Sequence, residues 1–172
     1  MDRKMCELKD GCIEAIIEIP MGSKNKYEID HERNVVKLDR VLYSSMSYPA
    51  EYGYIDYTLA LDGDPLDILV LTTEPTFPGC IIQSRVIGYL DAIDDGDEDY
   101  KLIAVNDFDP RFNHINELDD IPPHTLAEIK NFFETYKILE KKEVIIKEYN
   151  GKEDAIKLLR DCRKRYLDNK KD

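Results

Sequence analysis

The sequence is short of long apolar runs, positive charge and paired cysteines. No run of about 18 apolar residues is present to span a bilayer. The start, Met1 to Glu7, lacks the apolar segment of a secretory signal. Lysine and arginine number 24 against 36 aspartate and glutamate residues, a formal charge of −12. We therefore expect a cytoplasmic protein that binds neither membrane nor nucleic acid, because both carry negative charge.

The four cysteines, at positions 6, 12, 80 and 162, form no CxxC pair. His31, His114 and His124 do not lie near them at ligand spacing, so a zinc site is excluded. We expect four reduced thiols, most of them packed. The 172 residues suffice for one substantial core. No repeat, low-complexity linker or break in composition marks a second domain, which predicts one domain over residues 1–172.

Alternating apolar and polar residues predict strands in the first part of the chain. We expect strands over residues 13–19, 26–30 and 35–41, with turns at 20–23 and 31–34. Further strands are expected at 68–71, 80–90, 101–105 and 144–148. Short strands with turn residues between them favour a small closed barrel over a βαβ sheet.

Helical periodicity is found late in the chain. One helix is expected after Pro122-Pro123, because prolines suit a helix start. A second, terminal helix is expected from near Glu153, and residues 168–172 are expected to fray. The two apolar stripes are Leu126, Ile129, Phe133 and Tyr136 in the first helix, and Ala155, Leu159, Cys162 and Tyr166 in the second.

An acidic corner lies near the middle of the chain, at Asp62-Gly63-Asp64-Pro65-Leu66-Asp67, just before the apolar run 68–71. Gly63 has backbone angles open to it that other residues lack, and Pro65 fixes its own φ. Three carboxylates on a stiff corner suit a hard divalent cation, because Mg²⁺ demands oxygen ligands in a near-octahedral arrangement.

A second acidic segment, residues 91–99, precedes an apolar strand. Most of its carboxylates are expected to solvate a loop, since charge runs are usually exposed. Asp99 and Lys101 differ, because residues two apart in a strand share a face. A carboxylate that binds metal would then stand beside an ammonium that meets an anion. The same reasoning applies to Lys26 with Glu28.

Arg40 shares a strand face with Val36 and Leu38, where a guanidinium needs an anionic partner. The ordinary explanation is an ion pair with Asp39 or Glu51. Five tyrosines crowd into residues 43–57, and most are expected to pack in the core, although one or two phenols can reach a phosphate oxygen.

Taken together, these motifs resemble the family I soluble inorganic pyrophosphatases of the short prokaryotic type. The resemblance covers nearly the whole chain in family order. Its motifs are Glu18-Ile19-Pro20, Lys26-Tyr27-Glu28, Asp39-Arg40, Tyr48-Pro49 through Tyr54, the corner 62–67, Asp94 through Lys101, and Phe132 through Lys137.

The resemblance implies a five-stranded OB-like barrel with flanking helices, in the α+β class. It implies Mg²⁺-dependent hydrolysis of pyrophosphate to two phosphates by direct attack of a metal-activated water, with several Mg²⁺ ions in the site. Asp62, Asp67 and Asp99 would hold one ion, with Asp67 shared with a second. Asp94, together with Asp99, would bind an ion that arrives with substrate. Glu28 would bind a further ion, directly or through water, and Glu18 would lie in the outer shell.

The phosphate contacts implied by the family are Lys26, Arg40, Tyr52, Lys101, Tyr136 and Lys137. Asp64 matches the residue that deprotonates or orients the attacking water. The predicted catalytic residues are Asp64 together with three of the phosphate contacts: Tyr52, Arg40 and Lys26. Each role has a physical rationale, because pyrophosphate is anionic and an acidic pocket would reject it without cations.

Two alternatives remain open at this stage: a calcium module without catalysis, and an OB-like nucleic-acid binder. The EF-hand spacing is absent, and a charge of −12 opposes a nucleic-acid groove. The resemblance also implies a homohexamer, a dimer of trimers. The helix before Tyr136 carries Asn131, Thr135 and Ile138 where well-known members have histidines, and we expect Phe132 or Ile138 to supply an apolar contact patch instead.

Overall fold

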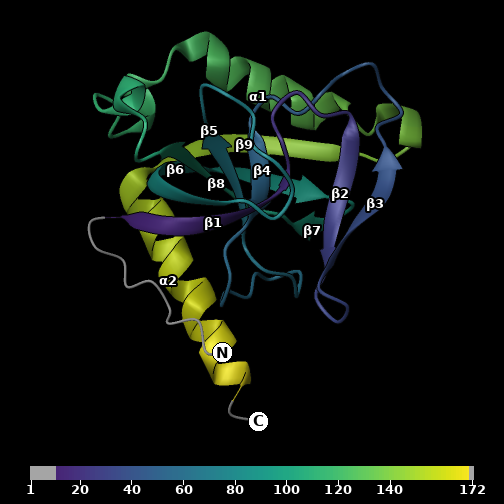
Figure 1. Ribbon diagram of the computed structural model, residues 1–172, viewed down its shortest axis with the longest axis horizontal. Coiled ribbons are helices and arrows are strands. Elements are labelled where there is room, and N and C mark those ends of the chain that lie inside the picture. Colours follow the sequence, from purple (N-terminus) through teal and green to yellow (C-terminus); the bar gives the residue numbers. More distant parts are fainter. Residues whose placement is uncertain (1–10, 171–172) are drawn as a thin grey trace.

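The computed structural model describes residues 11–170, with nine strands and two α-helices assigned in that range (Figure 1). The strands are β1 (Cys12–Ile19), β2 (Asn25–Asp30), β3 (Val35–Val41), β4 (Glu51–Tyr54), β5 (Asp67–Leu71), β6 (Ile81–Asp94), β7 (Asp97–Glu98), β8 (Lys101–Asn106) and β9 (Val144–Gly151). The helices are α1 (Pro123–Thr135) and α2 (Lys152–Asn169), with 3₁₀ turns η1 (Pro110–Phe112), η2 (Leu118–Asp120) and η3 (Ile138–Glu140).

Five strands form a closed ring. The order is β1, β4, β5, β8 and β6, and β6 returns to pair with β1. All pairs in the ring are antiparallel except β5 with β8, which is parallel and sets Asp67 opposite Lys101. β7 and β9 extend the sheet from β6. The expected sheet-dominated fold with helices is confirmed.

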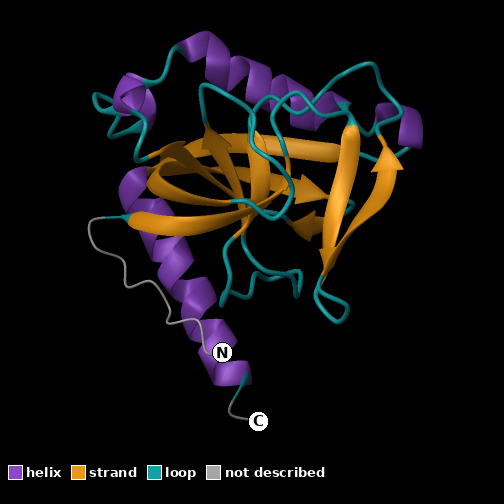
Figure 2. Ribbon diagram, viewed as in Figure 1, coloured by secondary structure: helices purple, strands orange, loops and turns teal. Residues whose placement is uncertain are grey.

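Two buried clusters line opposite faces of the ring, because successive side chains of a strand point to opposite sides. On β5, Leu69 belongs to the cluster that includes α1, whereas Ile68 and Val70 belong to the cluster that includes α2. Figure 2 shows the strands lying between the two helices. The stripes predicted for both helices are therefore the faces that cover the ring.

Strands β1 and β4 approach each other unusually closely at Gly53. A Cβ atom at this position would lie 1.9 Å from the carbonyl oxygen of Ile16. Gly53 faces Ile17 in the register of the pair, and its neighbour Tyr52 faces Ile19 after a shift in register. Only glycine allows this approach, which lets β4 present the Tyr52 side chain toward the cavity described below.

Strands β2 and β3 form a separate two-stranded sheet beside the ring (Figure 1). The Glu18 carboxylate on β1 accepts a hydrogen bond from Ile29 N–H at 2.8 Å. At the base, Gly22 N–H donates to the Tyr48 carbonyl and Tyr48 N–H to the Ser23 carbonyl. An isolated hairpin is marginally stable, so these contacts fix its position against the ring.

Several elements differ from the sequence predictions. β4 and β7 were not predicted, and β6 runs to Asp94 rather than to residue 90. The acidic segment is a hairpin rather than an open loop: Asp95 and Gly96 both have positive φ, which is the requirement of a tight I′-type turn. Asp168 and Asn169 continue α2 instead of fraying, and residues 171–172 lie outside the described range.

One expectation about aromatic residues was wrong, namely that Phe132 forms a contact patch. Phe132 is 1% exposed, so it cannot form a contact patch for another chain; it lies against Tyr48 and Tyr136. Tyr43 is exposed and does not pack in the core, whereas Tyr48 and Tyr54 are buried as expected.

The cysteines and helices agree in part with the sequence predictions. Cys162 is buried, whereas Cys12 and Cys80 are half-buried, and Cys6 lies outside the described residues. No disulfide joins the three cysteines that the structure describes. Neither α1 nor α2, the α-helices assigned between residues 11 and 170, combines the length and apolar character needed to cross a membrane.

Candidate active site

A polar cavity of about 470 Å³ opens between the ring and the β2–β3 hairpin. It brings together residues from five parts of the chain: the end of β1, strand β2, the segment from β4 to the start of β5, the segment from the end of β6 to β8, and the end of α1. Twelve of the thirteen predicted site residues line it: Glu18, Lys26, Glu28, Tyr52, Asp62, Asp64, Asp67, Asp94, Asp99, Lys101, Tyr136 and Lys137.

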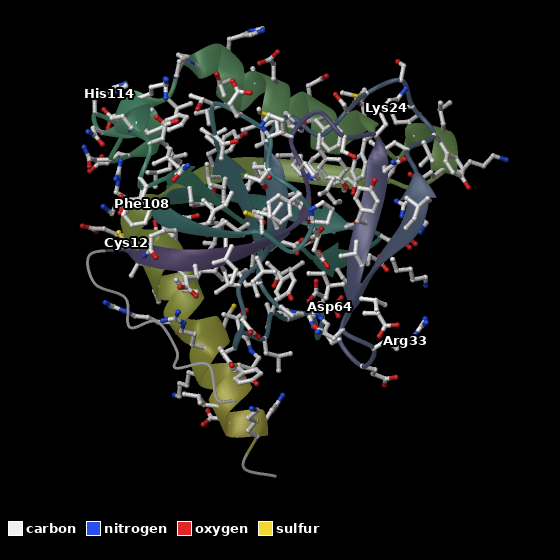
Figure 3. The ribbon with its side chains drawn as sticks, in the orientation of Figure 1. Cys12, Lys24, Arg33, Asp64, Phe108 and His114 are labelled. Carbon is white, nitrogen blue, oxygen red and sulfur yellow. The ribbon has the colours of Figure 1, made fainter. Side chains whose placement is uncertain are left out.

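The acidic corner is a turn held by local hydrogen bonds. Gly63 has a φ of +93°, and Asp64 N–H donates to the Asp62 carboxylate at 3.0 Å. The buried Thr58 hydroxyl accepts from Leu66 N–H at 2.8 Å and so ties the corner to the core. Figure 3 shows Asp64 near the turn end of the hairpin, where Arg33 is also labelled.

Lys101 is the charged centre of the cavity wall. Its side chain is 3% exposed, and its Nζ lies 2.9 Å from both Asp99 oxygens and 3.0 Å from Asp67 Oδ2. Burial alone would lower the pKa of Lys101, but the carboxylates of Asp67 and Asp99 outweigh it and raise that pKa above its ordinary value. The expected proximity of Asp99 and Lys101 is confirmed, although Asp99 lies before β8, which begins at Lys101, and does not share a strand face with it.

Tyr52 completes this cluster. Its hydroxyl donates to Asp67 Oδ2 and lies 2.9 Å from Lys101 Nζ. Burial, followed by the charge of Asp67, raises the pKa of Tyr52 well above 10. The phenol is therefore neutral at physiological pH and serves as a hydrogen-bond donor.

Two more lysines contact cavity carboxylates. Lys137 forms an ion pair with Asp94. Lys26 lies 2.7 Å from Glu28 Oε1, as expected from their spacing, and 3.2 Å from Asp39 Oδ2. Both lysines line the cavity, together with Asp94 and Glu28, so their ammonium groups are placed to meet an anion.

Arg40 is the one predicted site residue that does not line the cavity. Its Nη1 lies 2.6 Å from Asp39 Oδ2, which confirms the first of the two partners considered from sequence. Glu51 is not the other partner: it is fully buried and accepts from Met21 N–H, Thr76 N–H and the Thr76 hydroxyl. The second carboxylate on Arg40 is that of Glu140, at the end of η3.

The acids of the cavity repel one another. Burial raises the pKa of Glu18 to about 7, with the charge of Asp67 adding to the effect. Burial also raises the pKa values of Asp99 and Asp62, and neighbouring carboxylates add to both. Burial of a carboxylate among other carboxylates favours the bound proton or a bound cation.

The donor set fits divalent magnesium by its chemistry. Seven carboxylates and three lysines line the cavity, a formal excess of four negative charges when every group is ionised. Every carboxylate offers the hard oxygen that Mg²⁺ prefers. Within residues 11–170, no three His, Cys, Asp or Glu side chains stand arranged as a ready metal cluster. Magnesium commonly keeps several waters and takes only one or two protein carboxylates, so this arrangement is compatible with it.

Comparison with known proteins identifies the family of this chain. The model of the inorganic pyrophosphatases matches residues 15–167. The chain belongs to the inorganic pyrophosphatase family. The inorganic pyrophosphatase of Geobacillus stearothermophilus is 60% identical over 158 residues, covering 92% of this chain and 96% of that protein. That of Methanosarcina acetivorans is 51% identical over 168 residues, covering 97% and 100%.

Solved inorganic pyrophosphatases have the same fold. The structure from Thermus thermophilus aligns with a TM-score of 0.93 at 40% identity, covering 96% of this chain and 97% of that one. The structure from Helicobacter pylori aligns with a TM-score of 0.92, also at 40% identity, covering 96% and 99%. The resemblance noted from sequence is thus confirmed, and the chain is an enzyme, an inorganic diphosphatase.

Sequence reasoning missed part of the cavity lining. Tyr27, His31, Tyr54 and Pro65 also line it. Tyr27 lies inside the motif Lys26-Tyr27-Glu28, but its position there gives no sign of a cavity contact. Glu140 was missed as well, because its partner Arg40 lies 100 residues away in the chain.

Proposed function

We propose that the chain hydrolyses pyrophosphate to two phosphates with Mg²⁺ as cofactor, by direct attack of a metal-activated water. The observation that carries this proposal is that one cavity gathers twelve predicted site residues and a formal excess of four negative charges, in a member of the inorganic pyrophosphatase family. An anionic substrate enters such a cavity only when cations compensate the carboxylates.

The proposed ligands of magnesium are Asp62, Asp67, Asp94, Asp99 and Glu28, with Glu18 outside the first shell. When bound, several Mg²⁺ ions supply charge compensation for the phosphates and a lowered pKa for the attacking water. Tyr52 O–H holds Asp67 in place, and Lys101 holds both Asp67 and Asp99. These contacts keep the carboxylates oriented for coordination.

Asp64 is the proposed acceptor of the proton from the attacking water. It lines the cavity, is exposed, and makes no ion pair with a lysine or arginine within residues 11–170. A carboxylate that no ammonium neutralises accepts a proton more readily than one held in an ion pair.

The proposed substrate contacts are Lys26, Arg40, Tyr52, Lys101, Tyr136 and Lys137. Lys26, Lys101 and Lys137 carry positive charge to the cavity wall, and Tyr136 adds a phenol whose pKa burial raises, so that it stays protonated as a donor. Donors of this kind stabilise the charge that moves onto phosphoryl oxygens as the bond breaks.

We also propose a location, a domain organisation and an assembly for the protein. We place it in the cytoplasm as one domain and infer a homohexamer, with exposed apolar side chains such as Ile138 supporting contact between copies. Phosphate and pyrophosphate are the proposed ligands, with no role for nucleic acid or membrane. Sizing of the purified protein at micromolar concentration tests the assembly, and a monomer would contradict it.

The decisive experiment measures phosphate release from pyrophosphate. We expect turnover with Mg²⁺ and its loss with excess EDTA, restored when Mg²⁺ is added back. A folded protein that leaves pyrophosphate intact in the presence of Mg²⁺ would refute the proposal.

A further inference from the structure

A chain of alternating charges runs from the end of η3 to the cavity. Glu140 Oε1 lies 2.9 Å from Arg40 Nε, and Arg40 Nη1 lies 2.6 Å from Asp39 Oδ2. The same Asp39 oxygen lies 3.2 Å from Lys26 Nζ, which in turn lies 2.7 Å from Glu28 Oε1. Lys26 and Glu28 line the cavity, whereas Arg40, Asp39 and Glu140 do not.

Glu140 is the outer end of this chain and its most buried carboxylate. Its side chain is 8% exposed, against 29% for Asp39 and 45% for Glu28. It contacts Arg40 through two atoms, because Nη2 also donates to Oε2 at 3.3 Å. The close Nε contact is a charge contact that lacks the alignment of a hydrogen bond, so the buried Nε depends on Glu140 for compensation.

The contact links two parts of the molecule that the backbone leaves separate. Arg40 and Lys26 face each other in the register of the β2–β3 hairpin, which is a sheet of its own. Glu140 follows Lys137, and therefore belongs to the segment at the end of α1 that also lines the cavity. One hydrogen bond from Nη2 and one charge contact at Nε hold the guanidinium against Glu140 across this gap.

Apart from Glu140, the carboxylate that contacts Arg40 within residues 11–170 is that of Asp39. Asp39 is its neighbour in sequence and contacts only Nη1, so it moves with the strand and cannot anchor the strand. Without the Glu140 charge, the guanidinium keeps only the Asp39 carboxylate, whose Oδ2 also contacts Lys26 Nζ. A change in the Arg40–Asp39 contact then reaches the Lys26 ammonium in the cavity wall.

We propose that Glu140 is a positioning residue for pyrophosphate binding. It anchors Arg40 and, through Asp39, holds Lys26 in place at the cavity. The inference rests on the proposed function, because Lys26 and Arg40 are the proposed contacts to the phosphates. Glu140 itself lies outside the cavity lining and acts through Arg40.

The test compares Glu140→Gln with wild type in steady-state hydrolysis of pyrophosphate at saturating Mg²⁺. Gln keeps the size of the side chain and removes its charge. We expect KM to rise about tenfold with kcat changed less than threefold, because a lost contact that serves substrate and transition state alike raises KM alone. The matched control is Glu143→Gln, an exposed carboxylate three residues further on, for which KM stays at the wild-type value.

A double-mutant cycle with Arg40→Ala separates positioning from a general structural effect. If Glu140 acts through Arg40, adding Glu140→Gln to Arg40→Ala changes KM by less than twofold. The proposal is overturned if Glu140→Gln leaves KM unchanged in an active enzyme, or if it raises KM by the same factor in both backgrounds. Failure of the proposed function itself is a separate result, visible as a wild-type protein that does not hydrolyse pyrophosphate.

Discussion

Replacing Gly53 by alanine tests how tightly the ring is closed beneath the active site. The added Cβ would lie 1.9 Å from the Ile16 carbonyl oxygen, 2.8 Å from the Ile16 carbonyl carbon and 2.9 Å from Ile17 Cα. All three atoms belong to the backbone of β1, which no change of rotamer can move. Strands β1 and β4 would have to separate at the point where both are held in a closed ring.

The size of the effect follows from this geometry. An ordinary contact between carbon and oxygen is about 3.4 Å, so the strands must part by roughly 1.5 Å where they pair at about 4.8 Å. Overpacking a core costs about 1–3 kcal/mol, and a rigid backbone neighbour places this site at about 3 kcal/mol. For a chain of this size that corresponds to a fall in Tm of about 6–12 °C.

Thermal unfolding of the wild type, Gly53→Ala and Gly151→Ala measures this effect. Gly151 is the matched control, because a Cβ there meets no atom within 4 Å and its φ of −71° suits alanine. We expect the control to unfold within about 4 °C of wild type, since a Gly→Ala change at a permissive site is worth less than 1 kcal/mol. A Gly53→Ala protein with an unchanged Tm would refute the argument that the β1–β4 contact is rigid.

Four further predictions address the site and the core. Asp64→Asn is expected to keep its Mg²⁺ affinity in calorimetry and lose about 10²-fold or more in kcat, so intact turnover would remove Asp64 as proton acceptor. Asp67→Ala is expected to lower both rate and affinity for Mg²⁺, because in the proposed site this one carboxylate serves two ions; unchanged Mg²⁺ activation would contradict the shared ligand. Lys101→Met leaves Asp67 and Asp99 without their buried counter-ion, and is expected to lower stability in EDTA by about 3–5 kcal/mol in urea unfolding; a loss below 1 kcal/mol would contradict the buried ion pairs. Burial raises the pKa of Cys162, so alkylation at pH 8 is expected to label it only after unfolding, and rapid labelling of the native protein would show that the site opens.

Local patterns were sufficient to predict much of the fold. The alternation over residues 13–19 predicted β1, and the prolines at 122 and 123 predicted the start of α1. These signals lie within a few residues of one another and express the geometry of a strand or a helix directly. The acidic corner was predicted for the same reason, since Gly63 and Pro65 fix its shape locally.

Features that depend on distant partners were not predicted. β4 is four residues long and places Glu51 in the core, where a carboxylate is stable only because Met21 and Thr76 donate to it. The residues next to Glu51 in the sequence do not indicate which distant groups will donate hydrogen bonds to it. The Glu140 contact to Arg40 was hidden in the same way. The turn at Asp95-Gly96 is different, because an Asp-Gly pair is a known hairpin signal and was available in the sequence.

The parallel pairing of β5 with β8 has a consequence for how this enzyme folds. Asp67 and Lys101 are partners in that ladder, yet strand β6 and the β6–β7 hairpin lie between them in the chain. This ladder forms only when the segment between its two strands has reached a compatible position, and contacts of long sequence separation form slowly. Because the ladder that sets Lys101 beside Asp67 also buries core residues, we expect turnover to return on refolding together with the core and not before it.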